Sequence, residues 1–294
     1  MPAWLGHASG GGVVLTYHSI GRRPVDPYGQ AVSPATFERQ LRILKRATNV
    51  VTAATIADCV RRKASSAGLS AVTFDDGYSD VLSEALPVLE RLQVPMTLFV
   101  TTDPVSQACP FWWDRLTAAV FGSQPPDASR HQAFADVHAR LKRLSGSQRE
   151  DAIASLIAAE SWAPTLDLGR PLTAEELRHL AAHPLVDIGA HTVSHPSLAS
   201  LSEAEQRFEL VESQRWLESH LAQRIRLLAY PFGKAGDVSE VSRTAAKGSG
   251  YHAAFVTTPG PVTPDVDVMA IPRLTVHEWS DAEFEQRLRR VTSI

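Results

Sequence analysis

The sequence predicts an α/β protein whose mainly parallel sheet forms a distorted or incomplete (β/α) barrel of about seven strands. Short apolar runs alternate with helical patterns along the 294 residues, as crossover connections between parallel strands require. Polar residues suited to chemistry follow directly after several of these runs, and barrel active sites lie at that end of the strands. The pattern predicts a single domain over 1–294, with a helical insertion at 104–171.

The first part of the chain supplies four of the predicted strands. Each is a short run rich in apolar or β-branched residues, and we expect them at 13–17, 50–51, 69–74 and 95–100. Ser33 and Thr52 are typical N-cap residues and predict helices that begin just after them. A further helix is expected at 79–92, with a kink at Pro87 because proline cannot donate the helical hydrogen bond.

The alternation stops after residue 103 and resumes after residue 171. The segment between them carries apolar residues at helical spacing and a pair of tryptophans, so we expect helices that pack on the barrel or cover its mouth. Three capping boxes begin at Thr173, Ser202 and Ser280, and a further helix is expected near 238–247. The remaining strands are expected at 185–189, 225–230, 252–257 and 269–276.

Composition excludes several classes of partner. The net charge is −3 with no long basic run, so nothing indicates a nucleic-acid partner. Cys59 and Cys109 lie far apart and outside any CxxC pattern, which argues against a zinc knuckle or redox pair. We see neither a signal peptide nor a transmembrane span and expect a cytoplasmic protein; the oligomeric state cannot be read from the sequence.

Two clusters have the residue types of a metal site. Asp75 and Asp76 follow the strand at 69–74, and neighbouring side chains at a strand end point in different directions, so one carboxylate can bind a metal while the other acts as a base. A simple Asp-Gly turn is the alternative. His191 and His195 are four residues apart, and on a helical turn both imidazoles could hold one ion. Together these residues predict an Asp-His-His site for a divalent metal, with zinc expected first and cobalt or iron compatible.

Three segments resemble motifs of the polysaccharide deacetylase family, also called NodB-like or carbohydrate esterase family 4. They are Thr-Phe-Asp-Asp-Gly at 73–77, His-Thr-x-x-His at 191–195 and Tyr-Pro-Phe-Gly at 230–233. The resemblance implies a distorted (β/α) barrel. It also implies an enzyme that uses a divalent metal to remove N-acetyl groups, and sometimes O-acetyl or formyl groups, from sugars.

The resemblance assigns roles to matching residues. Asp76, His191 and His195 become the metal ligands. Asp75 becomes the general base that takes a proton from the attacking water. The expected substrate is an N-acylated sugar or polysaccharide, or a precursor of one.

The third motif supplies a candidate hydrogen-bond donor to the oxyanion, but it lacks an arginine that many relatives carry. Pro231 has no N–H, so the N–H of Phe232 is the expected donor to the oxyanion. Many relatives carry an arginine at the position of Leu228 to pair with the catalytic aspartate. Arg273 is our candidate to pair with Asp75 instead.

The general acid departs from the commoner family pattern. Many members have a C-terminal Leu-x-His motif, but here His277 follows Leu274 by three residues rather than two, and one step along a strand reverses the side chain. Other members, with a permuted motif order, resemble the opening Tyr17-His18 pair. We therefore favour His18 over His277 as the acid that protonates the departing amine.

Several alternatives remain open at this level. Removal of a formyl group from a lipid-linked amino sugar, or hydrolysis of a cyclic amide, would use nearly the same chemistry. A non-haem iron enzyme also uses two histidines and a carboxylate. A carbohydrate-binding barrel without catalysis is the third alternative.

Overall fold

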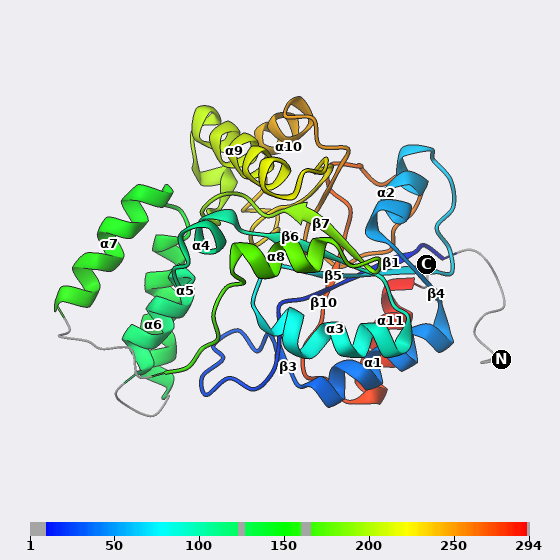
Figure 1. Cartoon of the computed structure of the whole chain (residues 1–294), viewed down its shortest axis with the longest axis horizontal. Coiled ribbons are helices and arrows are strands. Elements are labelled where there is room, and N and C mark those ends of the chain that lie inside the picture. Colours follow the sequence, from blue (N-terminus) through cyan, green and yellow to red (C-terminus); the bar gives the residue numbers. More distant parts are fainter. Residues whose placement is uncertain (1–9, 123–126, 160–165, 293–294) are drawn as a thin grey trace.

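The computed structural model describes residues 10–122, 127–159 and 166–292. Its centre is a parallel sheet in the order β10-β1-β5-β6-β7-β8-β9, with β4 paired to β5 (Figure 1). This curled sheet confirms the predicted incomplete barrel. The strands of this sheet are β1 (Val13–Tyr17), β4 (Asn49–Val51), β5 (Leu69–Phe74), β6 (Met96–Val100), β7 (Val186–Ala190), β8 (Leu227–Ala229), β9 (Ala253–Phe255) and β10 (Leu274–Thr275). A separate pair is formed by β2 (Ser19–Ile20) and β3 (Ala31–Val32).

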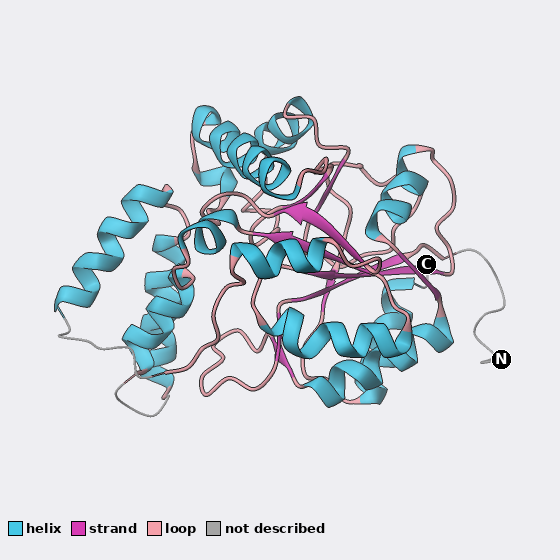
Figure 2. Cartoon of the chain, viewed as in Figure 1, coloured by secondary structure: helices cyan, strands magenta, loops and turns pink. Residues whose placement is uncertain are grey.

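Helices surround the strands, as expected for crossover connections (Figure 2). Helix α1 packs against α3 and α11, and α9 packs against α10. Within the described ranges, no helix has the length and apolar character needed to cross a membrane. The helices outside the insertion are α1 (Pro34–Ala47), α2 (Ala53–Arg61), the π-helix η1 (Val81–Ala85), α3 (Leu86–Leu92), α8 (Ala174–Ala181), the 3-10 turn η2 (Leu198–Ser200), α9 (Glu203–Leu221), α10 (Glu240–Gly248) and α11 (Asp281–Thr292).

The segment 104–171 contributes helices and no strand among its described residues. Its helices are α4 (Thr102–Gln107), α5 (Trp112–Phe121), α6 (Ala128–Leu141) and α7 (Gly146–Ala159). Helices α5, α6 and α7 lie together at one end of the molecule, at the left of Figure 1. Residues 123–126 and 160–165 of this segment lie outside the described part.

Residues of the same parity along the strands fill the barrel interior. An apolar cluster under the site includes Val14, Ala71, Phe99, Phe255 and Ile271. Thr16 on β1 and Thr73 on β5 lie two residues beyond Val14 and Ala71, and their hydroxyl oxygens are 3.1 Å apart. Arg273 donates to the Thr73 hydroxyl at 3.2 Å, so a polar layer separates the apolar floor from the strand ends.

Most helix starts follow their predicted caps. The side chains of Ser33, Thr52, Thr173 and Ser202 each accept a hydrogen bond from the backbone N–H three residues later. The helix expected at 79–92 is divided into η1 and α3. Pro87 sits in the first turn of α3, where a missing N–H costs least, so the predicted interruption occurs just before it.

The prediction of one long strand at 269–276 is wrong. Only Leu274–Thr275 pairs with β1, whereas Ile271 forms a parallel bridge with Phe255 at the end of β9. The chain therefore changes partner between these points and cannot continue one ladder. Its crossing brings Arg273 into the barrel interior, where the side chain is fully buried.

Gly189 in β7 leaves room for the Phe99 ring in the barrel interior. A Cβ atom at residue 189 would lie 2.5 Å from two ring carbons of Phe99 and 3.0 Å from the Leu227 carbonyl oxygen. The ring cannot retreat easily because it packs against Phe255 at a centroid distance of 5.4 Å. We expect Gly189→Ala to lower the free energy of unfolding by about 1–3 kcal/mol through overpacking.

Denaturant unfolding of both variants checks this expectation, with Gly236→Ala as the matched control. No atom lies within 4 Å of a Cβ built at residue 236. The control should be unchanged or slightly more stable, because alanine restricts the unfolded chain. Equal stability of the two variants would contradict the packing argument.

Candidate active site

The carboxyl ends of neighbouring strands bring the predicted site residues together. Asp75 follows β5 and His191 follows β7, with the end of β6 between them. The N–H of Thr101, just after β6, donates to the Asp76 carbonyl at 3.0 Å, and the N–H of Thr102 donates to the Thr192 carbonyl at 3.1 Å. The three loops are thus fixed to one another by backbone hydrogen bonds.

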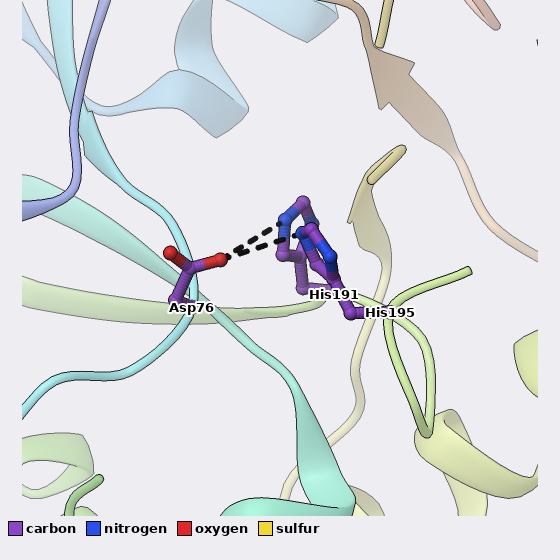
Figure 3. A group of neighbouring side chains, drawn as sticks. All are labelled: Asp76, His191 and His195. Atoms are coloured by element: carbon purple, nitrogen blue, oxygen red, sulfur yellow. Dashed lines mark ion pairs between the residues drawn. The ribbon is translucent and has the colours of Figure 1, made fainter. Parts of the chain in front are cut away.

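Asp76, His191 and His195 converge on one point (Figure 3). The Asp76 Oδ1 atom lies 3.6 Å from His191 Nε2 and 3.5 Å from His195 Nε2. These distances exceed ordinary hydrogen bonds, and Oδ1 is buried without a hydrogen-bond partner among the described atoms. All three ligand atoms lie within 4.8 Å of one another.

This spacing fits a bound cation. Tetrahedral zinc with ligands at about 2.0–2.1 Å separates those ligand atoms by about 3.3–3.4 Å, close to the distances found here. The Nδ1 of His191 lies 2.8 Å from the Ala229 carbonyl oxygen, which can only accept, so Nδ1 carries the proton. Its Nε2 lone pair is therefore free to face Asp76, in the arrangement typical of metal-ligating histidines.

Left-handed backbone conformations aim these side chains. Eight non-glycine residues of the described chain have positive φ, and four surround this site: Asp76 (72°), Thr192 (67°), His195 (60°) and Phe232 (60°). Asp75 continues the inward-pointing parity of β5, and the turned backbone brings its neighbour to the same centre. Each such conformation costs roughly 1–3 kcal/mol, so surrounding contacts must hold it.

Asp75 and Arg273 form a buried, two-pronged ion pair. Arg273 Nη1 donates to Asp75 Oδ1 and Nη2 donates to Oδ2, both at 2.7 Å. The exposed fractions are 1% for Asp75 and 0% for Arg273. The ion pair is therefore buried and is not a surface salt bridge. Leu228, at the position of the family arginine, lies buried in β8.

The charges of the site suit a bound cation. Burial opposes ionisation of Asp75, but the positive charge of Arg273 holds its pKa below the usual value. Burial and the charge of Asp75 raise the pKa of Asp76 well above its usual value. Burial also lowers the pKa of His191 and of His195, which keeps both imidazoles neutral and able to ligate. A cation would relieve the unfavourable charge on Asp76.

His18 and His277 lie at different places near the site. His18 lines one cleft together with Asp76, Tyr78 and Trp113. Burial lowers the pKa of His18 to about 4, while the charge of Asp75 opposes that decrease. His277 has its Nδ1 2.5 Å from the Gly29 carbonyl oxygen, and its ring contacts Trp279.

Aromatic side chains enclose the second histidine. The ring of His195 lies 4.5 Å from that of Trp113 and 4.7 Å from that of Phe232, measured between centroids. Trp113 comes from the insertion, and it is buried while its ring contacts a candidate ligand. None of the hydrogen bonds among the described residues uses the Phe232 N–H.

Sequence reasoning missed a buried polar network beside the cleft. Tyr78 donates its hydroxyl proton to Asp114 at 2.8 Å and accepts from Trp113 Nε1 at 2.7 Å. Arg23 pairs with Asp114 at 3.1 Å. Only the position of Tyr78, directly after Asp-Asp-Gly, could have indicated its closeness to the site.

The candidate site lies within a region that a known protein family matches. A family model described as polysaccharide deacetylase matches residues 62–254, which include all three candidate ligands and Asp75. YxkH of Bacillus subtilis, whose name assigns it provisionally to the polysaccharide deacetylases, is 29% identical over 205 residues. The aligned region covers 70% of this chain and 50% of YxkH, so the chain spans about half the length of this curated relative.

Solved deacetylase structures share the fold. The Streptococcus pyogenes deacetylase PplD, in complex with acetate, superimposes with a TM-score of 0.65 at 16% identity, covering 96% of this chain and 98% of PplD. IcaB from Ammonifex degensii gives a TM-score of 0.64 at 20% identity, covering 94% of this chain and 95% of IcaB. At these identities the likeness concerns the fold alone.

The ligand assignment predicts that zinc stabilises the metal-free protein through Asp76. At a free zinc concentration 1,000 times Kd, binding to the folded state alone adds about 4 kcal/mol to the free energy of unfolding. We expect Asp76→Asn to lose most of this gain, because a neutral amide is a much weaker ligand than a carboxylate.

Calorimetric zinc titration and thermal unfolding with and without zinc measure the effect. Asp136→Asn is the matched control, since Asp136 is exposed on α6. Zinc binding by Asp76→Asn at wild-type affinity would exclude this carboxylate as a ligand.

Proposed function

Because this chain belongs to the polysaccharide deacetylase family, we propose that it hydrolyses the N-acyl group, foremost N-acetyl, of an amino sugar in a saccharide or its precursor. One observation carries the proposal. A buried Asp-His-His cluster with the spacing of a cation site lies beside a second, ionised carboxylate. A metal-dependent hydrolase activates water with a cation and a nearby base.

Asp76, His191 and His195 would hold the divalent cation, and zinc is our proposed metal. When bound, the cation supplies Lewis-acid chemistry that acidifies a water to a pKa of about 7 and stabilises negative charge on the acyl oxygen. The buried, neutral imidazoles and the unpartnered Asp76 oxygen support this ligand set.

Asp75 is the proposed general base. Its Oδ2 lies 3.9 Å from His191 Nε2, so its carboxylate adjoins the centre where water would be activated. Arg273 keeps Asp75 ionised and fixes its orientation through both carboxylate oxygens. Each oxygen keeps a second lone pair for the proton.

The oxyanion and the departing amine need two further groups. The N–H of Phe232 is our proposed donor to the oxyanion, because its left-handed backbone follows a proline that has no N–H and no described hydrogen bond uses it. His18 is the proposed acid for the amine. It is neutral at pH 7 before substrate binds, so it must gain a proton in the complex before it can donate one.

The base assignment predicts that Asp75→Asn abolishes hydrolysis and leaves metal binding largely intact. Loss of a general base lowers kcat by about 10²- to 10⁴-fold. Acetate release from a panel of N-acetylated sugars, with added zinc, cobalt or iron, measures the activity. Zinc titration of the same variant is the control for an intact site.

Two results would contradict this reading. Full turnover by Asp75→Asn would exclude Asp75 as the base. A wild-type protein that releases no acetate from the panel but consumes oxygen with iron would favour the non-haem iron alternative instead.

The acid assignment predicts different effects at the two histidines. His18→Gln should lower kcat by about 10²- to 10⁴-fold, because the amine then departs without its proton donor. His277→Gln is the matched control and should change kcat little. Steady-state kinetics of both variants across pH 5–9 measure the difference.

The pH profile adds a second readout. If His18 is the acid, the wild-type kcat falls as the pH rises through the pKa of His18 in the complex, and His18→Gln loses that limb. Turnover retained by His18→Gln would mean that the proton taken by Asp75 reaches the amine instead.

A further inference from the structure

The loop that carries both candidate histidine ligands, residues 191–195, lies between two buried charged side chains. Arg149 comes from α7 of the insertion, and Glu209 comes from α9 of the barrel. Their exposed fractions are only 1% and 4%. Neither residue belongs to the motifs that indicated the site.

Arg149 donates hydrogen bonds to backbone carbonyl groups of the loop. Its Nη2 donates to the Ser194 carbonyl at 2.5 Å and to the Ser194 hydroxyl at 3.0 Å, and its Nη1 donates to the His195 carbonyl at 3.4 Å. The guanidinium carbon lies 4.9 Å from the centre of the Trp112 ring. The fork is thus supported on one face and directed at the second histidine.

Glu209 binds the same loop through its N–H groups. Its Oε2 accepts from the N–H of Val193 at 2.8 Å and from the N–H of Ser194 at 2.9 Å. Its Oε1 accepts from the Ser194 hydroxyl at 2.6 Å. Every polar group of Ser194, the residue directly before His195, is therefore bound by one charged side chain or the other.

The loop needs such support because of its backbone. Thr192 and His195 both have positive φ, a conformation that a free chain of these residues would leave. A hydrogen bond from the His195 N–H to the Thr192 hydroxyl is a weaker, local restraint. The N–H groups of Thr102 and Asp103 hold the Thr192 and Val193 carbonyls, so the first half of the loop is fixed by backbone hydrogen bonds. The Ser194 and His195 carbonyls are held by Arg149, and without it we expect the His195 ring to be aimed less firmly at Asp76.

We propose that Arg149 is a positioning residue that sets the metal affinity of the site by holding the Ser194 and His195 carbonyls. The inference rests on the proposed function only for the presence of a cation between Asp76, His191 and His195. It makes the insertion part of the metal centre, although the insertion supplies no ligand.

The two possible effects of Arg149, through its charge or through its position, predict opposite changes in metal affinity when it is removed. Arg149 is a cation beside a cation site, so its charge alone would weaken metal binding, and its removal would strengthen it. If it acts by position, removal weakens binding. Lysine keeps the charge but lacks the planar fork that reaches two carbonyl groups, so it should not replace arginine.

The test compares Arg149→Met and Arg149→Lys in the full chain, with Arg143→Met as the matched control. Arg143 is exposed in the same insertion. Competition with a chromophoric chelator measures zinc affinity, and absorption of the cobalt-loaded protein reports the coordination geometry. We expect both Arg149 variants to lose about 10- to 100-fold in affinity, the usual effect of removing a supporting group of a metal ligand.

Ser194→Ala provides a second variant without a charge change. It removes the hydroxyl that joins Arg149 to Glu209, and we expect a smaller loss of zinc affinity in the same direction. Unfolding of each metal-free variant is measured in parallel, and the affinity is compared for the folded protein. If Arg149→Met does not fold, Arg149→Lys and Ser194→Ala carry the test.

Three outcomes would overturn the proposal. The first is an unchanged zinc affinity in both Arg149 variants. The second is a higher zinc affinity in Arg149→Met together with a wild-type zinc affinity in Arg149→Lys. The third is a loss of zinc affinity in the control Arg143→Met as large as that in the Arg149 variants. The readout contains no sugar, so it separates this inference from the proposed function. A protein that binds zinc through this loop but releases no acetate would refute only the proposed function.

Discussion

The buried ion pair between Asp75 and Arg273 is the interaction on which the rest of this structure depends. Breaking such a pair by removing one partner typically costs about 3–5 kcal/mol, because the remaining charge has no water to solvate it. The pair joins the strand that carries the carboxylates to the last part of the sheet, across 198 positions of sequence. It also keeps Asp75 ionised, and that charge in turn raises the proton affinity of Asp76.

Conformational strain surrounds this pair and is held by contacts from outside the barrel. The turned backbone at Asp76 is secured by the loop after β6, and Gly77 accepts from the N–H of Leu172, where the chain returns from the insertion. The insertion also encloses His195 with Trp113. A site made only of strand ends would lack these contacts, so the insertion helps to shape the candidate site.

Local pattern predicted much of the fold and the candidate site. Alternation of short apolar runs with capped helices was enough for the incomplete barrel, and the motif residues Asp75, Asp76, His191 and His195 do lie together. Their catalytic roles stay predictions. The register of the last strand was not accessible, since the chain changes partner at Ile271 and no periodicity records such a change. Arg149 and Glu209 were missed because their buried charges are explained only by contacts with the loop at 191–195, which no local sequence pattern records.

The junction between β9 and the segment before β10 affects how the barrel opens. Between β9 and the segment before β10, one bridge at Phe255 and Ile271 joins the two edges, whereas β1 and β5 pair along five residues. This line is therefore one of the more weakly cross-linked parts of the sheet, as is the single pairing of β7 with β8 at Ala190 and Leu228, and this favours partial opening there under heat or denaturant. Arg273 lies two residues beyond the bridge, so such an opening would withdraw the cation from Asp75. Activity would then be lost while nearly all of the helices were still folded. Residual activity would therefore detect partial unfolding earlier than a measurement of helical content.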